Sequence, residues 1–177
     1  MKTFRLILIF LGFLTLGVIV VLLLSPKQLS YHSSIDIDLP ASEVWDAYTD
    51  PAFMPLWIES LDSAYYTTDG APGENSVMTL IYTQNENTVE VPEAVQTWLE
   101  DQLLVTKTNV GDLMEINNEV RFEQTDIDKT TIEFSSEVKA FNWIMRFSLW
   151  GSEETMIERS EQRLLKFAEL LELRNSG

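Results

Sequence analysis

The sequence predicts an α+β fold in which a curved antiparallel sheet of about seven strands wraps around a long C-terminal helix. Three observations support this prediction. Apolar and polar residues alternate through much of residues 63–140, a helical pattern with an apolar stripe fills residues 142–174, and two short helical patterns follow the first strand. The length of 177 residues suits one domain and an appendage. We expect this appendage to be one N-terminal transmembrane helix that precedes the domain.

The N-terminal segment is an apolar run from residue 6 to residue 24. It contains 19 residues without a charge, and a helix of that length spans about 28 Å, close to the thickness of a hydrocarbon core. A cleaved secretory signal is the alternative, but the run is long for one and ends in LLLSPKQLS without a small-residue cleavage site. We expect a cytoplasmic N-terminus (1–5), a signal anchor (6–24), a tether (25–30) and one domain (31–174).

The charges beside this run predict its orientation. Lys2 and Arg5 precede the run, whereas only Lys27 follows it closely. Because positive flanks stay in the cytoplasm, we expect a single-pass protein of the cytoplasmic (inner) membrane with an extracytoplasmic domain.

Composition excludes several functions. The net charge is −16, and residues 28–177 carry 28 acids against nine bases, which excludes nucleic acid as a partner. We expect this charge to keep the domain soluble rather than to form an acidic recognition patch. The chain has no cysteine and a single histidine, His32, so we expect no disulfide, no metal site and no cofactor.

The first elements follow from alternation and from proline breaks. Residues 31–39 alternate as a strand with one wet face. Ser42 is expected to cap a helix that runs to Thr49, and apolar residues at helical spacing over 53–61 predict a second short helix.

Six further strands follow the two short helices. They are predicted at 63–67, 77–83, 88–98, 103–109, 113–123 and 130–140. The even positions from 114 to 122 and from 132 to 138 in the last two strands are apolar, except for Asn118 and Ser136. A turn centred near Ile127 places Asn118 opposite Ser136. The two side chains either form a polar spot for a ligand in an apolar cavity, or bond only to each other or to a buried water.

The remainder, residues 142–174, is predicted to be helical, with Gly151 and Ser152 at a kink or a start. Ile157 and Leu164 belong to an apolar stripe of this helix, which must be buried against another element. The apolar face of the sheet is the only large surface against which it can pack.

The stretch IDLPASEVWDAYTDPAFMPLW (residues 37–57) resembles the front signature of the SRPBCC superfamily, the helix-grip proteins. That superfamily includes START lipid-transfer domains, polyketide cyclases and birch-pollen-allergen-like proteins. The matching positions are Pro40, Val44, Trp45, Asp50, Pro51 and Trp57, and EQRLLKFAELLE resembles the closing helix. The resemblance covers about residues 31–173. It implies a cavity for a hydrophobic ligand, with Trp45 in the core and Trp57 near the cavity rim.

The resulting hypothesis is a membrane-anchored protein that binds a hydrophobic or lipid-like small molecule, for transport or sensing. The candidate ligand-binding residues are Trp57, Tyr82, Asn118, Phe122, Phe134, Ser136, Ile157 and Leu164. One alternative is a polyketide cyclase-like enzyme, but strand parity reveals no inward carboxylate or histidine, so no catalytic residue is predicted. The other is a membrane-tethered interaction module whose cavity is filled by its own aromatic side chains.

A second group of candidates lies in NWIMRFSLWG, residues 142–151. Arg146 is expected to form a surface pair or to extend its charge toward water, with a ligand carboxylate as the alternative partner. Trp143, Phe147 and Trp150 are expected to pack in the core or to cover the cavity mouth, with docking on the bilayer as the alternative.

Overall fold

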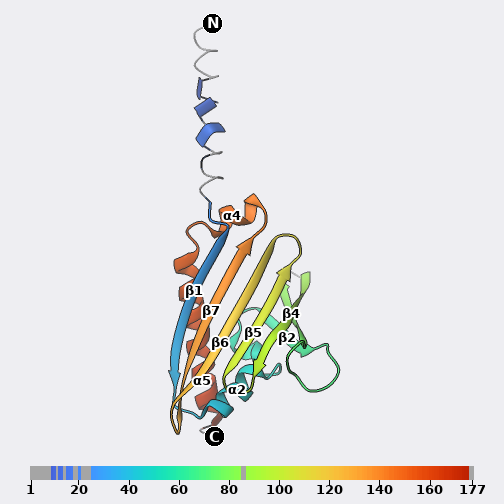
Figure 1. The fold of residues 1–177 in the computed structure, drawn as a ribbon, viewed down its shortest axis with the longest axis vertical. Helices are drawn as coiled ribbons and strands as arrows, with labels where there is room; N and C mark the ends of the chain where they lie inside the picture. Colours follow the sequence, from blue (N-terminus) through green and yellow to red (C-terminus); the bar gives the residue numbers. More distant parts are fainter. Residues whose placement is uncertain are drawn as a thin grey trace.

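The computed structural model describes residues 9, 10, 12, 13, 15–17, 20, 25–84 and 87–175. Their α+β architecture is a sheet with helices on one face (Figure 1). The elements are β1 (Gln28–Ile37), α2 (Ala41–Thr49), α3 (Met54–Trp57), β2 (Leu61–Tyr66), β3 (Val77–Gln84), β4 (Asn87–Leu99), β5 (Leu103–Val110), β6 (Met114–Asp126), β7 (Lys129–Ala140), α4 (Trp143–Leu149) and α5 (Glu153–Asn175).

The strands form one seven-stranded sheet in the order β1-β7-β6-β5-β4-β3-β2. Every neighbouring pair is antiparallel, and the first strand pairs with the last. Asn118 lies opposite Ser136, as the sequence predicts. This sheet with a long C-terminal helix confirms the predicted helix-grip architecture.

Several predicted boundaries are wrong at the front of the domain. β1 begins at Gln28, within the expected tether, because its first residues already pair with β7. The first helix begins at Ala41, so Ser42 lies inside the helix, and Pro40 stands at the N-cap without a side-chain bond. The second helix is a single turn that ends at Trp57, because Leu61 already pairs with Tyr82 in the sheet.

The predicted C-terminal helix is divided in two. Gly151 separates α4 from α5 with a φ of 75°, a left-handed conformation that favours glycine. α4 therefore lies across one end of the sheet, while α5 runs along the inner face toward the opposite end (Figure 1).

Trp45 is at the centre of the main core, as the sequence predicts. Its side chain is 2% exposed, and its ring makes edge contacts with Trp98 and Phe122 at centroid distances of 5.0 and 5.2 Å. Phe167 on α5 brings that helix into the same core by packing against Trp57 of α3. The short helices and α5 thus close one end of the curved sheet together.

The predicted membrane span over residues 6–24 lies largely outside the described residues. Within the part of the chain that the structure describes, no helix combines the length and apolar character needed to cross a membrane.

Candidate functional site: a cavity between sheet and helices

A cavity of about 360 Å³ lies between the inner face of the sheet and the helices. Its wall includes residues from six strands and from α2, α3 and α5, and fourteen of its nineteen lining residues are apolar or aromatic. Pockets for small organic ligands are typically about 300–1,000 Å³ and mainly apolar, with a few placed polar groups. The cavity therefore has the size and the character of a ligand site.

The most unusual side chain in this cavity is Glu93 of β4. It is 8% exposed, although glutamate is rarely buried without a partner. Its Oε1 accepts hydrogen bonds from Thr106 Oγ1 at 2.6 Å and from Asn118 Nδ2 at 3.3 Å. A carboxyl group is therefore held by two neutral donors on the inner face of the sheet.

The environment of Glu93 favours its protonated form. Burial raises the pKa of this carboxyl, because an apolar surrounding disfavours the charge. The hydrogen bonds from Thr106 and Asn118 oppose this effect, and so does the positive charge of Arg163 on α5, which also lines the cavity. A protonated Glu93 can donate a hydrogen bond, whereas an ionised Glu93 can only accept one.

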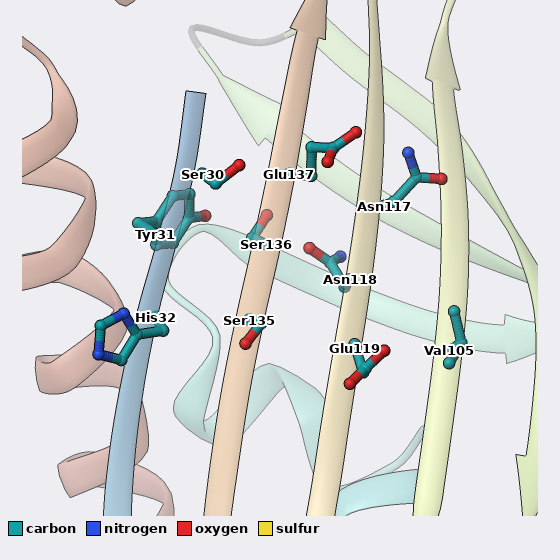
Figure 2. Close-up of a pocket in the computed structure, with 10 residues that line it drawn as sticks. All are labelled: Ser30, Tyr31, His32, Val105, Asn117, Asn118, Glu119, Ser135, Ser136 and Glu137. Atoms are coloured by element: carbon teal, nitrogen blue, oxygen red, sulfur yellow. The ribbon is translucent and has the colours of Figure 1, made fainter. Parts of the chain in front are cut away.

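A row of polar side chains extends from Glu93 across the inner face of the sheet. Thr106 lies opposite Asn118, Asn118 lies opposite Ser136, and Ser136 lies opposite Tyr31. Figure 2 shows the last three on the adjacent strands β6, β7 and β1. The sequence predicts only the pair of Asn118 and Ser136. In the structure this pair is part of a polar row that crosses five neighbouring strands.

Asn118 and Ser136 do not satisfy each other. Asn118 donates to Glu93, and Ser136 Oγ is buried without a hydrogen-bond partner among the described residues. The same is true of Trp57 Nε1 in the cavity wall. Unpaired buried polar atoms are rare and are often explained by an unseen water or ligand.

The structure divides the eight predicted ligand-binding residues into two groups. Trp57, Tyr82, Asn118 and Phe134 line the cavity. Phe122 and Leu164 are buried in the main core behind it, Ser136 of β7 lines a second hollow described below, and Ile157 lines a separate hollow at the start of α5. Trp57 is 3% exposed, so it forms part of the wall rather than an open rim.

The expectation of no inward carboxylate is wrong, and Glu93 is the residue that it missed. Val91, Glu93 and Val95 occupy alternate positions of β4, so all three face the interior. This alternation was available in the sequence. The threonines and Asn118 that surround Glu93 become its neighbours only through the register of three strands.

A second, larger hollow of about 610 Å³ lies on the outer face of the sheet (Figure 2). Its wall includes the outward residues Glu119, Ser135 and Glu137, together with the single histidine, His32. His32 and Ser135 are exposed. The described residues contain no group of histidines and acids that could hold a metal. The inner cavity is more enclosed than this hollow and is therefore the better candidate site.

Comparison with known proteins identifies the family. Residues 28–172 match the sequence profile of the family described as "Polyketide cyclase / dehydrase and lipid transport". The chain belongs to this family. The assignment to the SRPBCC superfamily, first suggested by residues 37–57, is thereby confirmed. No curated protein sequence matches the chain.

Solved structures similar to this member of the polyketide cyclase / dehydrase and lipid transport family share its fold. The Zhui aromatase/cyclase from Streptomyces sp. R1128 superposes with a TM-score of 0.65 at 10% identity, covering 83% of this chain and 95% of its own. A START superfamily protein from Mycobacterium smegmatis gives 0.60 at 14%, covering 80% and 98%. Norcoclaurine synthase from Thalictrum flavum, in complex with dopamine and hydroxybenzaldehyde, gives 0.59 at 15%, covering 83% and 88%. At these identities the likeness shows the fold alone.

Proposed function

We propose that this protein binds a hydrophobic or lipid-like small molecule in the inner cavity, for transport or sensing, while its N-terminal segment anchors it in the cytoplasmic membrane. The observation that carries the proposal is a partly enclosed, mainly apolar cavity with a single buried carboxyl group. Its volume also argues against the interaction module with a filled core, because the core aromatics leave about 360 Å³ open.

The polar row indicates what kind of ligand fits. Fourteen apolar or aromatic lining residues favour a hydrocarbon or aromatic body. Glu93 and Asn118 offer a hydrogen-bonding position on one wall, since the carboxyl can donate when protonated and the amide can both donate and accept. The expected ligand is therefore amphipathic, with one hydroxyl, carbonyl or carboxyl group on an apolar body.

The membrane anchor and its orientation rest on residues 1–27. An apolar run of 19 residues with positive charges before it supports a single-pass anchor with the cavity domain on the extracytoplasmic side. In that position the domain would exchange its ligand at the outer surface of the cytoplasmic membrane.

Binding is tested with residues 25–177, after a cooperative thermal transition has shown that this fragment is folded. Native mass spectrometry, followed by organic extraction, identifies any molecule that co-purifies. Thr108→Phe fills the cavity from β5, whereas Asn109→Phe places the same side chain on the exposed outer face of that strand. We expect the first variant to lose the ligand and the second to retain it. Equal retention by both folded variants would refute binding in this cavity.

The buried carboxyl also favours a second function, a cyclase-like enzyme. A glutamate with a raised pKa in an apolar pocket is suited to general acid–base chemistry, such as removal of a proton next to a substrate carbonyl. Incubation with a synthetic polyketide chain, followed by mass spectrometry, tests this possibility. Turnover that is abolished by Glu93→Gln would favour the enzyme, whereas retention of unchanged ligand would favour binding.

A further inference from the structure

We propose that the end of the domain formed by α4 and the β5–β6 turn lies in the interface of the bilayer that the N-terminal segment crosses. The inference rests on the anchor proposed above, and it adds a second contact surface with its own residues. That surface, here called the end patch, consists of Leu113, Phe141, Trp143, Ile144, Phe147 and Trp150.

The end patch is exposed although it is almost entirely apolar. Its six side chains are between 42% and 60% exposed. The two segments that form it are joined where the Phe141 amide donates to the Leu113 carbonyl at 2.9 Å. A group of exposed apolar side chains at one end of a domain marks an interaction site more often than isolated exposed residues do.

The helix α4 has apolar residues on two opposite sides. Leu149 is buried in a small core with Leu29, Val138 and Ala140, and this contact fixes the helix on the end of the sheet. The opposite side presents Trp143, Ile144 and Phe147, each of which is more than half exposed. A helix normally buries its apolar sides, so the outer side of α4 needs a second apolar environment.

The point where the chain enters the domain brings the end patch close to the proposed anchor. Arg146 of α4 donates through Nη2 to the Ser25 carbonyl at 2.6 Å, and the Ala140 amide donates to the Lys27 carbonyl at 2.9 Å. Ser25 directly follows the apolar run of residues 6–24. Figure 1 shows α4 at the end of the sheet where β1 begins, away from the C-terminus. A membrane-spanning segment that leaves the bilayer at Ser25 would therefore hold α4 at the bilayer surface.

Charge and composition select a membrane as the occupant. The domain is strongly acidic, yet residues 138–152 contain no acid and two bases, Lys139 and Arg146, and no acid occurs before Asp36. Acidic side chains would be repelled by a membrane surface with anionic lipids, whereas tryptophan and flanking bases are enriched at membrane interfaces. The α4 side of the end patch is therefore free of acids, and Asp112 is the acid next to Leu113 in the β5–β6 turn.

The cavity lies close to this end. Val110 and Ile116, which line the cavity, are within three residues of Leu113 in the chain. Docking of the end patch would bring this part of the cavity wall next to the lipid, on the route that a ligand from the bilayer would take.

The absence of cysteine makes a direct test possible. The full chain is reconstituted in phosphatidylcholine vesicles with a single NBD-labelled cysteine at Ser148→Cys, which lies on α4 but outside the end patch. The matched control is Ile127→Cys, an exposed position in the β6–β7 turn at the opposite end of the sheet. We expect a blue-shifted emission at residue 148, with loss of most of its intensity when the lipids carry doxyl spin labels. We expect neither effect at residue 127.

The double variant Phe147→Ser/Trp150→Ser, in the Ser148→Cys background, tests the apolar contact itself. It should keep its thermal transition and lose the doxyl quenching. Vesicle flotation separates the two proposals. A chain that does not float overturns both the anchor and the docking, whereas a chain that floats without quenching at residue 148 overturns the docking alone. Equal quenching at both positions, or a blue shift without quenching, overturns it as well. The latter result would indicate a second copy of the chain on the end patch.

Discussion

Replacement of Glu93 by glutamine tests the buried carboxyl most directly. Glutamine has nearly the same shape and keeps a side-chain oxygen that can accept from Thr106 and Asn118, but it cannot carry a charge. Any change in stability therefore reports the ionisation of Glu93 rather than a cavity or a lost hydrogen bond.

The sign of the effect follows from the raised pKa of Glu93 in the folded protein. Above the ordinary value of 4.5, unfolded Glu93 has lost its proton while the folded side chain still holds one. The stabilisation by this proton is complete below 4.5 and is lost as the pH rises through the folded pKa. Within that window the wild type loses up to about 1.4 kcal/mol per pH unit relative to the glutamine variant. Above that window the wild type has therefore lost stability relative to the glutamine variant, compared with their difference at low pH.

The measurement is urea unfolding of both proteins from about pH 5 to about pH 8, the range in which most proteins are stable. The other acids are the same in both proteins, so their contribution to the pH dependence cancels in the difference between the two unfolding free energies. Glu90→Gln is the matched control, because this substitution removes the same formal charge at an exposed position of the same strand. A difference between wild type and Glu93→Gln that stays constant with pH would refute the reasoning.

Three further predictions concern stability. Trp45→Ala should lower the unfolding free energy by about 3–5 kcal/mol, because the ring packs against Trp98 and Phe122, and a loss below about 1 kcal/mol in urea unfolding would contradict this packing. Gly151→Ala should cost about 1–2 kcal/mol at its left-handed φ of 75°. Gly73→Ala, which meets open space without a positive φ, should be neutral or stabilise by about 0.4–1 kcal/mol, and equal melting temperatures for the two variants would refute the difference. Tyr66→Phe should cost about 1 kcal/mol by removing the hydroxyl that donates to the Thr49 carbonyl, and an unchanged unfolding midpoint would show that the bond is not formed in solution.

The fold could be predicted because its pattern is local. Alternation identified all seven strands, and the proline and aspartate signals around Trp45 and Trp57 located the short helices. The boundaries were less accurate, because residues such as Gln28 join a strand through pairing with a partner about a hundred positions away. Gly151 was recognised as a break, but its conformation decides whether two helices or a kink result.

The pairing of Asn118 with Ser136 was predicted correctly, although the sequence did not reveal all of the reason. Asp126 pairs with Lys129, and a hairpin continued from that pair without interruption would place Asn118 opposite Glu137. A bulge between Gln124 and Asp126 shifts the register by one residue and produces the observed pair. Alternation requires this shift, because it alone keeps the apolar faces of both strands inward.

The site itself could be predicted only in part. Glu93 was recognisable as an inward residue from the alternation with Val91 and Val95. Its partners were not, because they come from β5 and β6 and depend on another bulge, between Val95 and Thr97 of β4. Phe122 and Leu164 show the opposite limit. Their apolar faces were predicted correctly, but sequence periodicity does not distinguish a cavity wall from the core behind it.

The strand order has a consequence for the assembly of the chain during synthesis. β2 to β7 form a meander in which every strand pairs with the next, so each hairpin can close soon after it leaves the ribosome. β1 is made first but pairs only with β7, so it must wait for most of the domain. The main core also cannot be completed early, because Phe167 belongs to α5, the last helix to be synthesised. We therefore expect β1 docking and α5 packing to be late, coupled events, and truncation before α5 to leave a chain with an open edge and an exposed apolar face.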